Sequence, residues 1–149
     1  MSTQEQYRLG IAAYSAGDYE EAVRLLAPVA AERRSPADAP ARYYLALAHY
    51  QLAITKFEAR RFPEATRHFR AAAWANPTGA DYARFLAACY VQTGQLELAG
   101  RELQSMLAHR PDDAGVRIRL ALVLHRQGSP TQAQALLREG LRVFLVKKV

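Results

Sequence analysis

Cysteine is almost missing from this sequence, which holds one, Cys89, among 149 residues. A single cysteine excludes a disulfide within the chain and is typical of a reducing compartment. Long hydrophobic runs are missing too, since no apolar stretch approaches the roughly 18 residues of a membrane-spanning helix. The first residues, Met1 to Gln6, lack the basic and then apolar pattern of a secretion signal. We therefore expect a cytoplasmic protein that does not insert into membranes.

Motifs of catalysis and metal binding are missing as well. The sequence has no glycine-rich phosphate loop and no Gly-x-Ser-x-Gly nucleophile elbow. Its histidines fall in separate predicted helices or at their ends, and none has the spacing of a helical metal site. They are His49, His68, His109 and His125. We expect no enzyme activity, no catalytic residue, no metal site and no cofactor.

Acidic residues are fewer than basic ones: the sequence has 14 Asp and Glu and 20 Lys and Arg, which gives a net charge of +6. Such a balance attracts nucleic acid or an acidic partner. The basic residues are nevertheless scattered along the whole chain and mixed with acids. The doublets are Arg33-Arg34, Arg60-Arg61 and Lys147-Lys148. Solvated helix faces explain this pattern better than a nucleic-acid surface, and a basic RNA-binding array is kept only as a second alternative function.

What the sequence does contain is a repeated unit of 34 residues with the pattern of two helices joined by a turn. Three consecutive copies carry similar residue types at this spacing. The equivalent positions are Leu52, Leu86 and Leu120; Ala53, Ala87 and Ala121; Ala65, Ala99 and Ala133; and Phe69, Leu103 and Leu137. A fourth copy comes first, but its Leu9 lies 43 residues before Leu52, so nine residues are inserted there.

These landmarks resemble the tetratricopeptide repeat family, whose unit carries a Leu-Gly pair in helix A, a Gly-Asp-Tyr-like turn, an alanine early in helix B and a closing proline. The first copy, from Leu9-Gly10 through Gly17-Asp18-Tyr19 to Ala22, is the most similar to the family. The helix A tryptophan is replaced by Gln6, His49, Ala83 and Arg117, and the last closing proline by Leu145. The resemblance implies an all-α fold, a right-handed α-solenoid of helix-turn-helix repeats.

The length and the continuous repeats predict a single domain over residues 1–149. Its repeats are expected at about 3–36, 46–79, 80–113 and 114–147, with an insertion at about 37–45. A second Leu-Ala pair at Leu45-Ala46 precedes Leu52-Ala53 by nearly two helical turns. The insertion is therefore expected to lengthen a helix. Cys89 falls at a small core position of helix A, and Trp74 is expected to be buried between repeats.

The resemblance also implies a protein-interaction scaffold that binds a partner segment in a concave groove lined by the A helices. Some family members hold a terminal carboxylate with a basic clamp, but at those positions only Arg84 could do so here. The groove is instead expected to take a protein or peptide segment with apolar anchors. The predicted groove residues are Tyr7, Ile11, Tyr14, Tyr50, Ile54, Phe57, Arg84, Ile118 and Leu122.

Self-association into a homo-oligomer is the first alternative function. The long helix of the second repeat has an apolar stripe that contains Tyr43 and Leu47, and it either packs on neighbouring helices or contacts a partner or second copy. The last helix stays apolar to its end, with no polar capping repeat after it. A partner, a second subunit or further sequence is expected to cover it. The candidate association residues are Tyr43, Leu47, Phe144 and Leu145.

Overall fold

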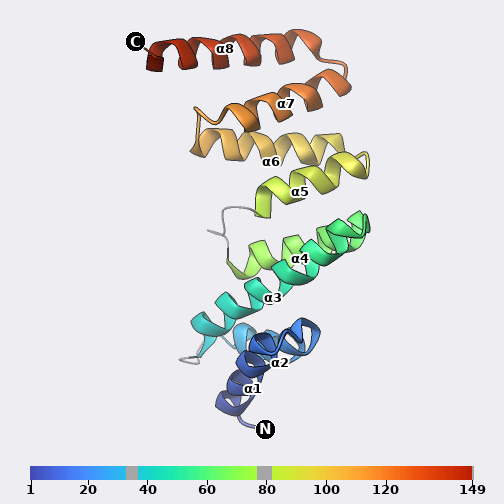
Figure 1. Cartoon of the computed structure of the whole chain (residues 1–149), viewed down its shortest axis with the longest axis vertical. Helices are drawn as coiled ribbons and strands as arrows, with labels where there is room; N and C mark the ends of the chain where they lie inside the picture. The colour runs from blue at the N-terminus through green and yellow to red at the C-terminus, as the bar shows by residue number, and fades with distance from the viewer. Residues whose placement is uncertain (33–36, 77–81, 149) are drawn as a thin grey trace. The chain divides into compact units, whose positions relative to one another are not determined.

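The computed structural model describes residues 1–32, 37–76 and 82–148, and all regular elements in these ranges are α-helices that follow one another in pairs (Figure 1). The helices are α1 (Thr3–Ser15), α2 (Tyr19–Ala31), α3 (Asp38–Glu58), α4 (Phe62–Ala75), α5 (Tyr82–Gln92), α6 (Leu96–His109), α7 (Ala114–Arg126) and α8 (Pro130–Lys148). The all-α, helix-turn-helix repeat fold expected from the sequence is confirmed. None of the helices, so far as the structure describes them, is long and apolar enough to span a bilayer.

The chain divides into two compact units, Met1–Tyr82 and Ala83–Val149, and each is described by itself. The first contains α1 to α4, and the second contains α6 to α8 with nearly all of α5. Each unit therefore holds two helical pairs of the predicted kind. The single domain over residues 1–149 stays a prediction.

The turns inside the pairs use one repeated backbone position with a positive φ angle. Gly17, Gly94 and Gly128 have φ values of 81°, 76° and 83°, and Arg60 occupies the equivalent place with φ of 60°. Glycine adopts this left-handed conformation without steric cost, whereas arginine does not. The turn of the second pair therefore has the same geometry as the others with a less suitable residue.

The inserted residues add helical turns to the start of α3, as the sequence predicted. This helix has 21 residues, whereas α1 and α7 have 13 each. Ala41 and Leu45 from the added turns join one buried cluster with Leu26 and Val29 of α2. The insertion is thus held in place by apolar packing on the preceding helix.

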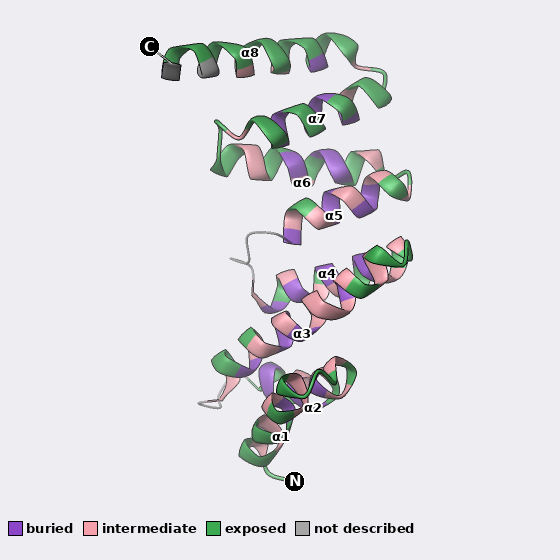
Figure 2. Ribbon diagram, viewed as in Figure 1, coloured by how far each residue is buried: buried purple, intermediate pink, exposed green. Residues whose placement is uncertain are grey.

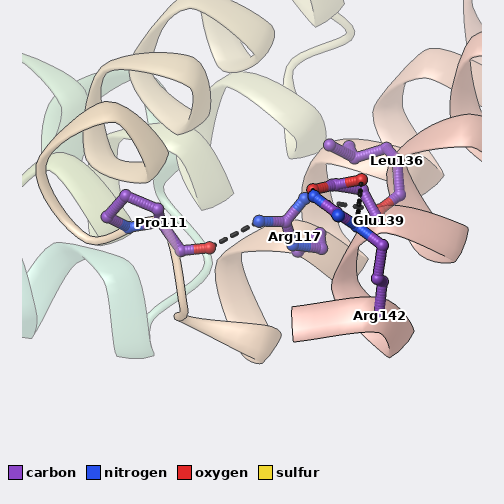
Figure 3. Close-up of polar contacts among 5 residues, drawn as sticks. All are labelled: Pro111, Arg117, Leu136, Glu139 and Arg142. Carbon is purple, nitrogen blue, oxygen red and sulfur yellow. Dashed lines mark hydrogen bonds and ion pairs between the residues drawn. The ribbon is translucent and has the colours of Figure 1, made fainter. Parts of the chain in front are cut away.

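The second unit has an arginine at the centre of its last pair (Figure 3). Arg117 is only 8% exposed, and its Nη2 donates to the carbonyl oxygen of Pro111 at 2.5 Å, while Nη1 donates to that of Leu136 at 3.4 Å. A Cβ atom at Gly140 would lie 2.3 Å from Cδ of Arg117. Glycine at this position of α8 therefore makes room for the arginine between α7 and α8.

Two single residues were assigned to packing from the sequence, with different outcomes. Cys89 is fully buried in α5, as predicted. The side chain of Trp74 is 60% exposed near the end of α4, so the prediction that it is buried is wrong. Repeat position alone did not show that this indole stays largely exposed.

Candidate functional site

An open hollow of about 710 Å³ lies between α1 and the start of α3 in the first unit. Its volume is in the range of small-molecule and peptide-anchor pockets. Most of its lining is apolar, and two of the predicted groove residues, Tyr7 and Ile11, belong to it. The lining residues, which we call the α1–α3 hollow, are Gln4, Tyr7, Arg8, Ile11, Ala12, Ala37 and Pro40.

The local sequence explains how this hollow is positioned. Tyr7 and Ile11 are four residues apart, so they lie on one face of α1. On another face Gly10 is buried, and a Cβ atom there would come within 2.6 Å of the Leu26 side chain. Glycine therefore lets α1 approach α2 closely. Pro40 lies in the first turn of α3, where backbone N–H groups have no partner within the helix, so its missing N–H costs nothing there. It forms part of the wall of the hollow opposite α1.

A group of tyrosines ties α1 to α2 and α3 beyond Ile11. The ring of Tyr14 lies 5.6 Å from that of Tyr44 and 5.5 Å from that of Tyr19, and Tyr43 lies 5.4 Å from Tyr44. Burial, followed by the neighbouring tyrosines, raises the pKa of Tyr14. The predicted groove residue Tyr14 is thus half-buried in a packed aromatic group, while Tyr43 remains 51% exposed.

The predicted groove residues of α3 pack mainly within their own repeat. Tyr50 lies 6.1 Å from the ring of Phe69, which is fully buried, and 5.7 Å from Tyr82. Phe57 lies 5.4 Å from Phe62 and 6.3 Å from Phe69. Ile54, between them in α3, is also half-buried. The sequence left open whether the apolar stripe of this helix packs on neighbouring helices or contacts a partner or second copy. These contacts are of the first kind.

The remaining groove residues belong to the second unit and are treated as a separate group. Ile118 and Leu122, one turn apart on α7, are 52% and 61% exposed. Arg84 of α5 is exposed, with its guanidinium carbon 5.6 Å from the centre of the Phe85 ring. The exposed apolar pair has the character of a surface that contacts a partner.

The candidate association residues are only partly accessible. Leu47 is half-buried, Leu145 is 54% exposed, and the side chain of Phe144 lies outside those that the structure describes. Leu145 belongs to a larger feature of the apolar last helix: Leu137, Leu141 and Leu145 recur every four residues on α8 and are all exposed. We call these three residues the α8 leucine stripe. In Figure 2 most of α8 is exposed, and among its described residues only Ala133 is buried.

The sequence analysis missed a histidine pair between α3 and α4. The Nδ1 atoms of His49 and His68 are 3.1 Å apart. Burial, and then the charge of His68, lowers the pKa of His49 to about 4, while burial is the main cause of the lowered pKa of His68. The two residues are 19 positions apart, and the equivalent pair in the last repeat is Arg117 and Leu136, which also touch. The repeat register was the signal that could have found the pair.

Comparison with known proteins agrees with this architecture. A family model described as tetratricopeptide repeat matches residues 7–52 and 50–114. A search of curated protein sequences gives no match.

Similar solved structures include "Crystal structure of MamA", with 18% identity, 99% of this chain and 81% of that chain covered, and a TM-score of 0.57. "MamA 41-end from Desulfovibrio magneticus RS-1" has 19% identity, coverage of 99% and 78%, and a TM-score of 0.62. "Crystal structure of MamA protein" has 17% identity, coverage of 94% and 90%, and a TM-score of 0.60. At these identities the likeness is one of fold alone.

Proposed function

Because the chain belongs to the tetratricopeptide repeat family, we propose that it is a non-catalytic protein-interaction scaffold that binds a segment of another protein in the α1–α3 hollow. The observation that carries the proposal is the hollow itself, an apolar depression between two A helices that contains Tyr7 and Ile11. Exposed apolar surface that is concave and rimmed by polar groups is typical of recognition sites.

The lining of the hollow indicates what the partner segment offers. Tyr7, Ile11 and Pro40 provide apolar walls, and Arg8 and Gln4 provide polar groups beside them. Full burial of one leucine or phenylalanine contributes about 1.5–3 kcal/mol, so a segment needs two or three such anchors to offset the cost of association. A partner segment with apolar anchors and an acidic residue opposite Arg8 fits this lining, and the net charge of +6 favours an acidic partner.

Selection from a phage-display library of random peptides tests this proposal. Peptides selected on the purified chain are expected to be enriched in aliphatic or aromatic residues next to Asp or Glu. The double change Tyr7→Ala, Ile11→Ala is expected to weaken the selected peptides at least about tenfold, because each anchor loses its apolar wall. The matched control is Leu9→Ala, which removes a side chain that is 41% exposed on the same helix but outside the hollow.

Fluorescence anisotropy gives the dissociation constants, and circular dichroism verifies that each variant is folded. Failure to enrich any peptide, or equal binding to the chain and to the folded double variant, would place partner recognition elsewhere.

A second candidate function is self-association through the α8 leucine stripe. The specific observation is that Leu137, Leu141 and Leu145 are 45%, 59% and 54% exposed at helical spacing. A row of this kind can be buried against the same row of a second copy in an isologous interface. Light scattering over a concentration series is expected to give a mass near twice 16.6 kDa, and Leu141→Glu to return it to the monomer value. The control Gln132→Glu adds the same charge at an exposed position on the opposite face of α8 from Leu141 and is expected to leave the mass unchanged. A monomeric mass at every concentration contradicts this candidate.

A further inference from the structure

The His49–His68 pair is used by neither surface described above, and it joins two different helices. His49 is in α3 and His68 in α4, and both side chains are half-buried. Their Nδ1 atoms face each other at 3.1 Å and their ring centres are 5.3 Å apart. At this separation one Nδ1–H donates to the other Nδ1, so at least one ring nitrogen holds a lone pair directed at its neighbour.

The same separation matches the spacing of two ligands on one metal ion. Zinc–imidazole bonds are about 2.0–2.1 Å long, so two nitrogens 3.1 Å apart subtend an angle of about 100° at a shared ion. This value lies between the angles of square or octahedral sites and those of tetrahedral sites. Binding of an ion therefore requires the two rings to turn so that both Nδ1 lone pairs meet at one point beside the Nδ1–Nδ1 line.

The pair is also in the right protonation state. Metal ions bind neutral imidazole, and burial keeps both rings neutral at pH 7 by lowering their pKa values. On binding, the donating ring transfers its proton from Nδ1 to Nε2 through solvent, so that both Nδ1 lone pairs face the ion. No net proton is released at neutral pH.

The charged groups around the pair limit the strength of the site. Lys56 and Arg67 act against a positive charge at His68, and Glu64 and Glu20 act in its favour. Glu64 is paired with Lys56 at 3.4 Å and with Arg61 at 2.6 Å. Within the described part of the chain, no group of three or more His, Cys, Asp or Glu residues is arranged around one ion. An ion bound at this pair would therefore have two ligands from these side chains, with water in its other coordination positions.

We propose that His49 and His68 bind one divalent transition-metal ion of the imidazole-preferring class, Cu²⁺, Ni²⁺ or Zn²⁺, through both Nδ1 atoms and so cross-link α3 to α4. Two nitrogen ligands hold these ions but not Mg²⁺, which prefers oxygen. Cu²⁺ binds more tightly than Ni²⁺ or Zn²⁺. The ion joins the two helices of one repeat, so it stabilises the folded state by mass action.

The test uses the full chain without an affinity tag at pH 7.5, titrated with CuCl₂, NiCl₂ or ZnCl₂. Calorimetry is expected to give one equivalent bound, and a saturating ion to raise the melting temperature by about 5 °C or more. MgCl₂ is expected to have no effect. His68→Gln, which keeps a polar side chain at this position, is expected to abolish both signals.

The matched control is His109→Gln, because His109 is an exposed histidine in another helical pair. It is expected to leave binding and stabilisation unchanged. Electron paramagnetic resonance of the Cu²⁺ complex gives a readout that needs no variant, since hyperfine coupling to two imidazole nitrogens is expected. Equal stabilisation of the chain and of His68→Gln, absence of any shift, or coupling to a single nitrogen would overturn the proposal.

Discussion

Four equivalent turn residues show what a single side chain costs this fold. Gly17, Gly94 and Gly128 have positive φ angles, and so does Arg60. A non-glycine residue in the left-handed region costs roughly 1–2 kcal/mol. The guanidinium of Arg60, 5.9 Å from the centre of the Phe62 ring, offsets only part of this cost.

Arg60→Gly is therefore expected to stabilise the chain by about 0.5–1 kcal/mol, since the relief of backbone strain exceeds the added entropy of the unfolded glycine. Gly94→Ala, the opposite change at the equivalent turn, is expected to destabilise by about 1 kcal/mol. Urea denaturation measures both. A less stable Arg60→Gly variant would show that the contact with Phe62 outweighs the backbone strain.

His49 makes stability depend on pH in a defined window. Its pKa is about 4 in the folded chain and 6.5 when unperturbed, so between these values the unfolded chain binds a proton that the native chain does not. The contribution of His49 to folding stability is therefore fully present above pH 6.5 and is lost as the pH falls toward 4. Because the ring is partly exposed, we expect a loss of about 1 kcal/mol between pH 7.5 and pH 5.0.

His49→Gln is expected to reduce this pH dependence, whereas His125→Gln, at an exposed position of α7, is expected to leave it unchanged. Urea midpoints at the two pH values provide the measurement. If the urea midpoint changed equally between the two pH values in the unmodified chain and in His49→Gln, the pH dependence of stability would be due to other groups.

At the scale of helices, the packing of α7 on α8 depends on the fit between Arg117 and Gly140. Gly140→Ala would place a Cβ atom 2.3 Å from Arg117 Cδ and displace the guanidinium from the carbonyl oxygens of Pro111 and Leu136. We expect a loss of about 2 kcal/mol, although alanine favours helix over glycine by about 1 kcal/mol. Thermal unfolding measures the change.

Gly100→Ala is the matched control, because its Cβ would lie 3.8 Å from Val123 in ordinary contact. This variant is expected to be as stable as the chain or more so. In a double-mutant cycle, Gly140→Ala should cost much less once Arg117 is replaced by alanine. Additive effects would show that the crowding at Gly140 does not involve the arginine.

The helices could be predicted from the sequence because their signals are local. The repeated leucines and alanines, the turn glycines and the Leu45-Ala46 pair gave the helical pairs and the lengthened α3. Burial is not local. Leu137 occupies the repeat position of Phe69 and Leu103, which are 0% and 1% exposed, yet it is 45% exposed itself. The difference depends on whether another element covers the position.

The candidate sites depend on contacts between distant residues, and the sequence could give only parts of them. Tyr7 and Ile11 were identified, but Ala37 and Pro40, the opposite wall of the hollow, carry no chemical signature. The histidine pair was missed because its members are 19 residues apart and on different helices. Tyr50 and Phe57 show the converse case, since an apolar stripe has the same pattern whether it packs internally or faces a partner.

At the scale of the whole molecule, the net charge of +6 distinguishes two kinds of partner. Binding of a peptide in the apolar hollow is expected to weaken less than about threefold between 50 and 200 mM salt, because Arg8 is the one charged residue among the described residues of its lining. An RNA-binding array with 6–10 phosphate contacts would lose about 10³–10⁵ in affinity over the same range. Anisotropy titrations with a selected peptide and with a single-stranded RNA measure the salt dependence of the two kinds of binding. Tight RNA binding that falls steeply with salt would contradict the scaffold proposal.

The added turns of α3 have a consequence for how such chains diversify. α3 ends at Glu58, at the repeat position where α1 and α7 also end, so the extra residues all precede the repeat unit. Insertions or deletions there change the length of one wall of the hollow without rotating any side chain between Ala46 and Glu58. If the hollow binds a partner as proposed, partner choice can therefore change through insertions or deletions that precede Ala41, because Ala41 and Leu45 are fixed by their packing in the buried cluster with α2.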